Sequence, residues 1–315
     1  MSVTTEKRLS GSQGAAANGV NLNKNSVASR LSYLDLSKGI GIFLVVLVHA
    51  LYSSDTGSQQ WSVYAQGVIL AFVMPLFFMI SGALQGRKLR SPSFHEHTYL
   101  KKLAAAILLP FYALSLLFAG LNVVFLGRSD GPTLFQMLRG MLIEQSNPAL
   151  MPSGVLWYLF VLFVLSMMGY FAFRITRESG LYVLLCVGML LHILYPAAFS
   201  EIDYFAFRRI AQFSLFYFLG LTLSGLILSR QVSYRWFAFV SGVCILLAGV
   251  AATSTFTETF IGHAAIDSAH SVALLFGAYG IFPCFFLLGT ASLLCQVAEN
   301  AWPVRFLTSC GASSI

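Results

Sequence analysis

Charged side chains are scarce in this chain. They make up 10% of its 315 residues, against about 25% in ordinary soluble domains. Hydrophobic residues account for 57%, and the mean hydropathy is +0.76. The sequence also lacks a Walker-type loop, a dinucleotide fingerprint, an HExxH motif and paired CxxC motifs. These absences disfavour an ATP-driven pump, an oxidoreductase and a zinc hydrolase. The composition predicts an all-α membrane protein with many spans.

Cysteines are few and isolated. Four of the five lie in apolar stretches, and none has CxxC spacing, so we predict neither disulfides nor a metal site. Residues 1–29 are rich in Ser, Asn, Gly and Ala and lack apolar periodicity, which predicts a disordered cytoplasmic tail. The tail has no apolar core of the signal-peptide type, so the first span is expected to be retained. Residues 30–315 then form a single transmembrane domain.

Apolar segments predict a transmembrane helical bundle with about eight to nine spans. The 30-residue run 268–297 exceeds the length of one ordinary span, so it is either one broken, tilted helix or two short ones. An amphipathic piece around 134–143 is too short and too polar to cross. The other spans are expected near 34–54, 63–85, 103–126, 154–173, 181–199, 210–228 and 236–252.

Lys and Arg are unevenly divided between alternate loops. If the N-terminus is cytoplasmic, fourteen fall on the inner side and four on the outer side, with Arg305 assigned to neither. Cytoplasmic loops carry an excess of basic residues, so we predict a cytoplasmic N-terminus. The same rule explains the net charge of +7, and we therefore expect no nucleic-acid partner.

The stretch from Leu34 to Ser54 is apolar from Gly39 onward, yet it carries Asp35, Lys38 and His49. On a helix, the eleven-residue step from Lys38 to His49 is about 1100°, which leaves both on one stripe and about 16 Å apart along the axis. An ionisable group inside a membrane usually lines a pathway or cavity, so His49 is a candidate functional residue. A neutral histidine that ties two helices together by hydrogen bonds is the structural alternative.

This stretch and three others resemble the acyltransferase-3 family of integral-membrane O-acyltransferases. The first has the pattern D-x-x-K-G-I-G-I-x-x-V-V-x-x-H from Asp35 to His49. The others match the family's FFxISG, LWFLxxL and FFxLG stretches, and they are PLFFMISG (75–82), VLWYLFVLF (155–163) and FYFLG (216–220). The ordered set covers the chain from about Arg30 to its end. The family has about ten spans, so we expect its final helix to be missing here.

The resemblance implies O-acyl transfer, with acetyl the expected group, from cytoplasmic acyl-CoA to a hydroxyl of a cell-surface polysaccharide or lipid-linked sugar at the inner membrane. His49 falls on the family's essential histidine and is expected to be the general base, since imidazole exchanges protons near neutrality. Lys38 matches the basic residue of the motif and is expected to serve the acyl-donor path. Lys38 is otherwise a snorkelling anchor. Asp35 belongs to the same motif and is a third candidate catalytic residue; the structural alternative is that Asp35 only pairs with Lys38.

Further candidates flank the spans. The cations Arg87, Lys88, Lys101 and Lys102, in a cluster that also contains Arg90, are a candidate phosphate site for acetyl-CoA, although a topology signal alone accounts for such a cluster more often. Trp157, Arg208 and Arg209 are candidate substrate-binding residues on the outer side, where Trp157 is otherwise an interfacial aromatic. Outer-side residues that the sequence does not rank for orienting His49 or an acceptor sugar are Asp55, Glu201, Asp203, Glu258, His263, Asp267 and His270.

Two other classes remain open from the residues alone. A transporter or exporter of saccharides or lipid-linked sugars would also combine many spans, an intramembrane histidine and a broken late helix. Matching internal repeats would favour transport, and no convincing pair occurs. A membrane scaffold without activity is the third class. Membrane lipid is an expected partner in all three.

Overall fold

The computed structural model describes residues 32–51, 60–92, 94–121, 133–144, 156–198, 204–228, 269–298 and 300–313. These residues are almost entirely helical and contain no strand. The elements are the opening helix (Ser32–Leu51), α2 (Gln60–Leu89), α3 (Glu96–Leu121), α4 (Leu134–Leu142), α5 (Trp157–Thr176), α6 (Glu178–Ala198), the 3₁₀ helix η2 (Tyr204–Ala206), α7 (Phe207–Thr222), α8 (Ser224–Ile227), α11 (Ala269–Val297) and α12 (Trp302–Ala312).

Four of the described helices are long and apolar enough to cross a bilayer: the opening helix, α2, α3 and α5. Shorter apolar stretches lie in α6 and α11. The all-α membrane class predicted from composition is therefore confirmed. The full count of spans stays a prediction, because the expected span at 236–252 and the 1–29 tail lie outside the described residues.

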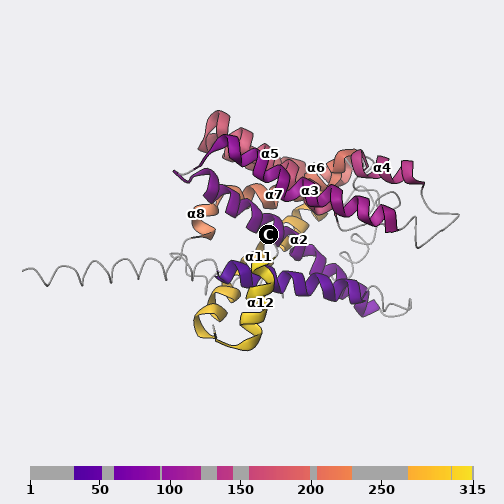
Figure 1. Cartoon of the computed structure of the whole chain (residues 1–315). Helices are drawn as coiled ribbons and strands as arrows, with labels where there is room; N and C mark the ends of the chain where they lie inside the picture. The colour runs from indigo at the N-terminus through magenta and orange to yellow at the C-terminus, as the bar shows by residue number, and fades with distance from the viewer. Residues whose placement is uncertain are drawn as a thin grey trace, which may run out of the picture.

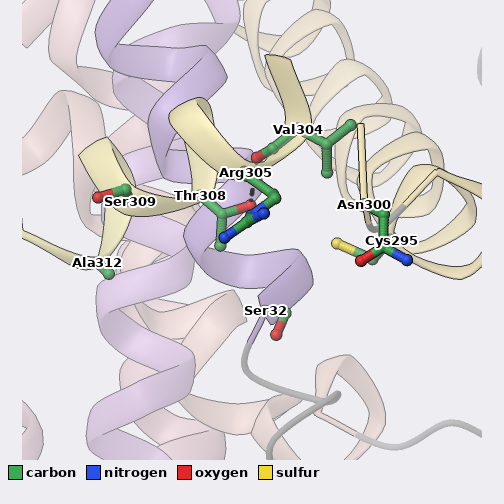
Figure 2. A pocket seen from close by; sticks show the side chains of 8 residues that line it. All are labelled: Ser32, Cys295, Asn300, Val304, Arg305, Thr308, Ser309 and Ala312. Carbon is green, nitrogen blue, oxygen red and sulfur yellow. Dashed lines mark hydrogen bonds between the residues drawn. The ribbon is translucent and has the colours of Figure 1, made fainter. Parts of the chain in front are cut away.

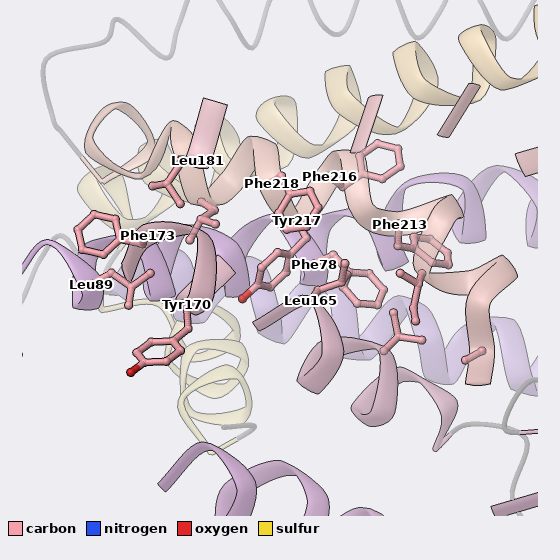
Figure 3. Close-up of a cluster of buried hydrophobic side chains, with 14 of the residues drawn as sticks. Phe78, Leu89, Leu165, Tyr170, Phe173, Leu181, Phe213, Phe216, Tyr217 and Phe218 are labelled. Atoms are coloured by element: carbon pink, nitrogen blue, oxygen red, sulfur yellow. The ribbon is translucent and has the colours of Figure 1, made fainter. Parts of the chain in front are cut away.

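Helix α2 occupies the centre of the arrangement. It contacts α5, α7, α8 and α11. Figure 1 shows it between the opening helix and α12 on one side and α3, α5 and α6 on the other. The largest cluster of buried side chains fills the space between α2, α5 and α7, where Phe78, Leu165, Phe213 and Tyr217 meet (Figure 3).

Two glycines set the distance between α2 and α7. A Cβ on Gly82 would overlap the Tyr217 carbonyl oxygen, and one on Gly220 would overlap the Met79 carbonyl oxygen. Small residues let transmembrane helices approach until their backbones touch. The glycines that end the PLFFMISG and FYFLG stretches therefore meet at one crossing, which explains why both stretches end in glycine.

Gln85 of α2 forms the centre of a buried polar network in this core. Its Nε2 donates to the Tyr99 hydroxyl at 2.6 Å and to the Ser166 carbonyl oxygen at 2.7 Å. Its Oε1 accepts from the Tyr217 hydroxyl, which also lies 2.9 Å from Ser166 Oγ. A buried amide is tolerated only when its donors and acceptors are paired, as they are here. The network fixes α3, α5 and α7 around α2.

Arg90, directly after α2, joins three other segments. Its Nε and Nη2 donate to both carboxylate oxygens of Glu178, at 2.7 and 2.6 Å. Its Nη1 donates to the Leu221 carbonyl oxygen at 3.0 Å and to Ser224 Oγ. One guanidinium thus satisfies a carbonyl at the end of α7 and binds the first residue of α6.

Replacing Arg90 with methionine is expected to lower the free energy of unfolding by about 1–3 kcal/mol, because the groups at the end of α7 lose a charged donor. The exposed part of the Glu178 pair contributes little of this. Thermal unfolding of the purified protein in detergent measures the change. Arg87→Met removes the same charge from an exposed position of α2 and is the matched control. Equal unfolding temperatures for the two variants would contradict this role of Arg90.

The helix boundaries depart most from the sequence expectation at the start of α3 and within the 210–228 span, and the structure decides between the two alternatives for 268–297. Helix α3 begins at Glu96, seven residues before the predicted Leu103, because Tyr99 is buried and bonded to Gln85. The predicted 210–228 span is interrupted after Thr222, where the short α8 begins. The 268–297 run is one helix, α11, with Pro283 inside it. The amphipathic piece at 134–143 is confirmed as α4, which begins with a capping box at Thr133.

Candidate active site

Lys38 lies on the buried side of the opening helix. Its side chain is 6% exposed, and its Nζ is 2.8 Å from Asp35 Oδ1 one turn earlier. Removing an ammonium from water is costly unless a counter-charge is close. The Asp35–Lys38 ion pair, the structural alternative for Asp35, is thus present, and Lys38 is held inside the helical bundle rather than extended toward the surface. A catalytic role for either residue stays a prediction.

His49 lies on the same uninterrupted helix, about 16 Å further along its axis. Its side chain is exposed among the described residues, whereas the adjacent Val48 is buried. The helix therefore carries a buried, paired cation near one end and, near the other, an imidazole that is exposed among the described residues. The structure does not bring Lys38 and His49 together, so any joint role would require a substrate that extends between them.

The four cations predicted to bind phosphate gather at one end of the α2–α3 pair. Arg87 and Lys88 lie at the end of α2, and Lys101 and Lys102 lie in the second turn of α3; all four are exposed. The Lys88 Nζ is 5.0 Å from the centre of the Tyr99 ring, which supports it by a cation–π contact. The four side chains are exposed to a ligand among the described residues, and the group remains a candidate phosphate site.

Trp157 and Arg209, predicted independently, lie in contact. The Arg209 guanidinium is 4.9 Å from the Trp157 ring centre, and its Nη1 donates to Gln212 Oε1 at 3.1 Å. Trp157 also stacks on Phe213, with ring centres 5.5 Å apart, and Phe213 stacks on Phe78 at 4.9 Å. Arg208, on the adjacent position of α7, is exposed. Trp157 and Arg209, both half-buried, thus form a partly exposed surface, and the Phe213 and Phe78 rings that continue the stack are buried in the core.

The structure also assigns structural roles to other polar groups. His192 is buried, and its Nδ1 lies 2.7 Å from the Gln212 carbonyl oxygen, as expected for a packing residue. Ser81 Oγ is 3.5 Å from the Tyr158 hydroxyl, a contact that the sequence did not predict. Among the described residues no group of three or more His, Cys, Asp or Glu is placed to hold a metal ion.

The unranked outer-side candidates stay untested. The side chain of His270 is not among the described ones, and Asp55, Glu201, Asp203, Glu258, His263 and Asp267 lie outside the described residues. Arg305, which the loop count left unassigned, is the residue that sequence reasoning missed. It lines a pocket between α12 and the start of the opening helix. No sequence signal identified it, because the pocket is closed by Ser32, which lies at the other end of the chain.

The chain has long apolar helices that pack through glycine contacts, as helical membrane proteins do. One of these helices, the opening helix, carries a paired lysine and a histidine. A family model described as an acyltransferase domain matches residues 31–314. The chain therefore belongs to the acyltransferase-3 family, and the membership supports acyltransferase activity. No curated protein and no solved structure matches the chain significantly.

Proposed function

We propose that this chain is an O-acyltransferase of the plasma membrane, the inner membrane in bacteria. It moves an acyl group, acetyl by expectation, from cytoplasmic acyl-CoA to a hydroxyl of a cell-surface polysaccharide or a lipid-linked sugar. The observation that carries the proposal is the acyltransferase match over residues 31–314, which includes Lys38 and His49 within one helix.

His49 is the general base of the proposed reaction. Its imidazole accepts the proton of the acceptor hydroxyl while the hydroxyl oxygen attacks the thioester carbonyl carbon. The tetrahedral intermediate then breaks its bond to the CoA sulfur, the His49 imidazolium returns its proton to that sulfur, and CoA leaves as the thiol while an ester remains on the sugar. Exposure of His49 among the described residues supports this role, because an acceptor must reach the imidazole.

Lys38 and the exposed cations serve the donor. In the proposed topology the N-terminus is cytoplasmic, so Lys38 and the cations Arg87, Lys88, Lys101 and Lys102 belong to the side that acyl-CoA approaches. The Asp35 pair holds the Lys38 ammonium in place. Positioning the donor and acceptor in one geometry lowers the entropic part of the barrier.

The test uses membrane vesicles from cells that express the chain, radiolabelled acetyl-CoA and total surface glycan. Label released from the glycan by mild base is the expected result, because oxygen esters hydrolyse under these conditions. A transporter would instead move labelled saccharide across the vesicle membrane without forming an ester. Saccharide movement without base-labile label would overturn the proposal.

The Trp157–Arg209 surface is proposed to bind the acceptor sugar. Trp157→Ala or Arg209→Gln is expected to raise the acceptor KM by about tenfold with little change in kcat, since one stacking or charged contact contributes roughly 0.5–2 kcal/mol. Initial rates at varied acceptor concentration measure the change. Phe171→Ala alters an exposed aromatic side chain on the same helix and is the control. A fall in kcat at unchanged KM would refute acceptor binding here.

A further inference from the structure

A pocket of about 530 Å³ lies between α12, the turn that follows α11 and the first residue of the opening helix. Its size falls within the range of ligand pockets, about 300–1,000 Å³. Figure 2 shows the Arg305 side chain between Thr308 on α12 and Ser32 at the start of the opening helix, with Asn300 and Cys295 at the opposite wall.

The lining offers hydrogen-bond donors and positive charge. Arg305 contributes an exposed guanidinium, while Ser32, Asn300 and Ser309 contribute hydroxyl and amide groups. None of the eight described residues that line the pocket is acidic. A planar guanidinium accompanied by neutral donors is the combination that proteins use to bind phosphate esters.

Helix α12 packs closely against the opening helix. A Cβ on Gly311 would overlap the Asp35 carbonyl oxygen, and one on Gly39 would overlap the Leu307 carbonyl oxygen. The backbones therefore touch beside the Asp35–Lys38 pair. Arg305 projects from a helix whose position is set by the helix that carries Lys38 and His49.

The pocket and Lys38 lie toward the same end of the opening helix. Ser32 precedes Lys38 by six residues, about 9 Å along the helix axis. An anionic group in the pocket would thus lie closer to that end than Lys38 does, and His49 lies further along the same axis. A donor with phosphates in the pocket and an extended arm could follow this helix toward His49.

We propose that the pocket lined by Arg305, Ser32, Asn300 and Ser309 binds the phosphate-bearing nucleotide part of the acyl donor. The inference rests on the proposed function for the identity of the donor. In this proposal Arg305 makes the principal contact with the donor phosphates, in place of the exposed cations Arg87, Lys88, Lys101 and Lys102 of α2 and α3. Those four cations then attract the donor without fixing it.

Binding of radiolabelled, unacylated CoA to the purified full chain in neutral detergent tests the proposal by equilibrium dialysis. Arg305→Gln is expected to weaken binding by about ten- to a hundredfold, the effect of losing hydrogen bonds to a charged group. Arg305→Lys keeps the positive charge but lacks the planar guanidinium, and it is expected to lose less CoA affinity than Arg305→Gln. Arg174→Gln removes the same charge from an exposed position outside the pocket and is expected to bind CoA as the unmodified chain does.

Competition separates the sources of phosphate. Adenosine 3′,5′-bisphosphate is expected to displace CoA from the unmodified chain, whereas inorganic phosphate and phosphatidylglycerol micelles at equal concentration are not. Displacement by phosphatidylglycerol as effective as that by the nucleotide would identify a lipid headgroup site and overturn the donor assignment. Equally effective displacement by inorganic phosphate would show a site without nucleotide selectivity and would overturn it too.

The outcome is independent of turnover, because no acceptor is present. If CoA binding depends on Arg305 but the chain transfers no acyl group, the assignment of the pocket stands and the proposed function is refuted. If Arg305→Gln transfers acyl groups with an unchanged KM for the donor, the assignment of the pocket as the donor site is refuted and the proposed function stands. Unchanged CoA binding by Arg305→Gln would overturn the inference directly.

Discussion

Replacing His49 with alanine is expected to reduce acyl transfer by a factor of about 10²–10⁴, the usual contribution of a positioned general base. The acceptor hydroxyl is a weak nucleophile until its proton is removed. Without the imidazole, no described side chain of the opening helix within one turn of this position can accept that proton, since Val45, Val46, Val48 and Ala50 are apolar. The loss should fall on kcat, because His49 acts in the reaction rather than in binding.

Base-labile label in surface glycan, measured at equal protein level, gives the size of the effect. Val46→Ala is the matched control: Val46 is 61% exposed, lies one turn before His49 and carries no ionisable group. We expect it to keep the activity of the unmodified chain. His49→Gln retains a hydrogen-bonding side chain of similar size but cannot take the proton, so it should be as inactive as His49→Ala. Activity in His49→Gln would show that the residue contributes hydrogen bonding and not proton transfer.

Replacing Gly82 with leucine is expected to prevent the bundle from assembling. The new Cβ would overlap the Tyr217 carbonyl oxygen and lie 2.9 Å from the Leu221 amide nitrogen. Both are backbone atoms of α7, so relief requires the two helices to separate along the contact that also holds Gly220 against Met79. Overpacking a well-filled core costs about 1–3 kcal/mol, and a backbone contact should exceed that range because no side chain can rotate away.

The yield of monodisperse protein after extraction into mild detergent measures this defect. Gly120→Leu is the control, because a Cβ at Gly120 meets nothing within 4 Å. It should be obtained at the level of the unmodified chain, whereas Gly82→Leu should be recovered at roughly a tenth of that level or less, as expected when destabilisation exceeds about 1.4 kcal/mol in a marginally stable fold. Equal recovery of both leucine variants would show that the α2–α7 approach is not required for folding.

The sequence predicted features that depend on position along one helix. Apolar length identified the opening helix and α5, and an amphipathic stretch too short to cross a membrane identified α4. The Asp35–Lys38 pair was one of two alternatives for Asp35, and the two residues are three apart on one helix, where side chains can meet. Such features need no knowledge of neighbouring elements, and the structure confirms them.

Features that depend on which helices meet could not be predicted. Arg90 belongs to a run of cations near the end of α2, and sequence alone does not distinguish it from Arg87, although only Arg90 reaches Glu178 and the end of α7. The Gln85 network joins residues of four helices that are distant in sequence. Lys38 illustrates the limit, because a lysine at the end of a span has the same sequence context whether it is buried or reaches the membrane surface.

The central claim is that this chain transfers an acyl group by using His49. Purified protein reconstituted in liposomes with acetyl-CoA and a soluble oligosaccharide acceptor allows released CoA thiol and sugar ester to be counted in the same sample. The account predicts one ester for each thiol with the unmodified chain and neither product above background with His49→Ala. Thiol release and ester formation that continue undiminished in His49→Ala would contradict it.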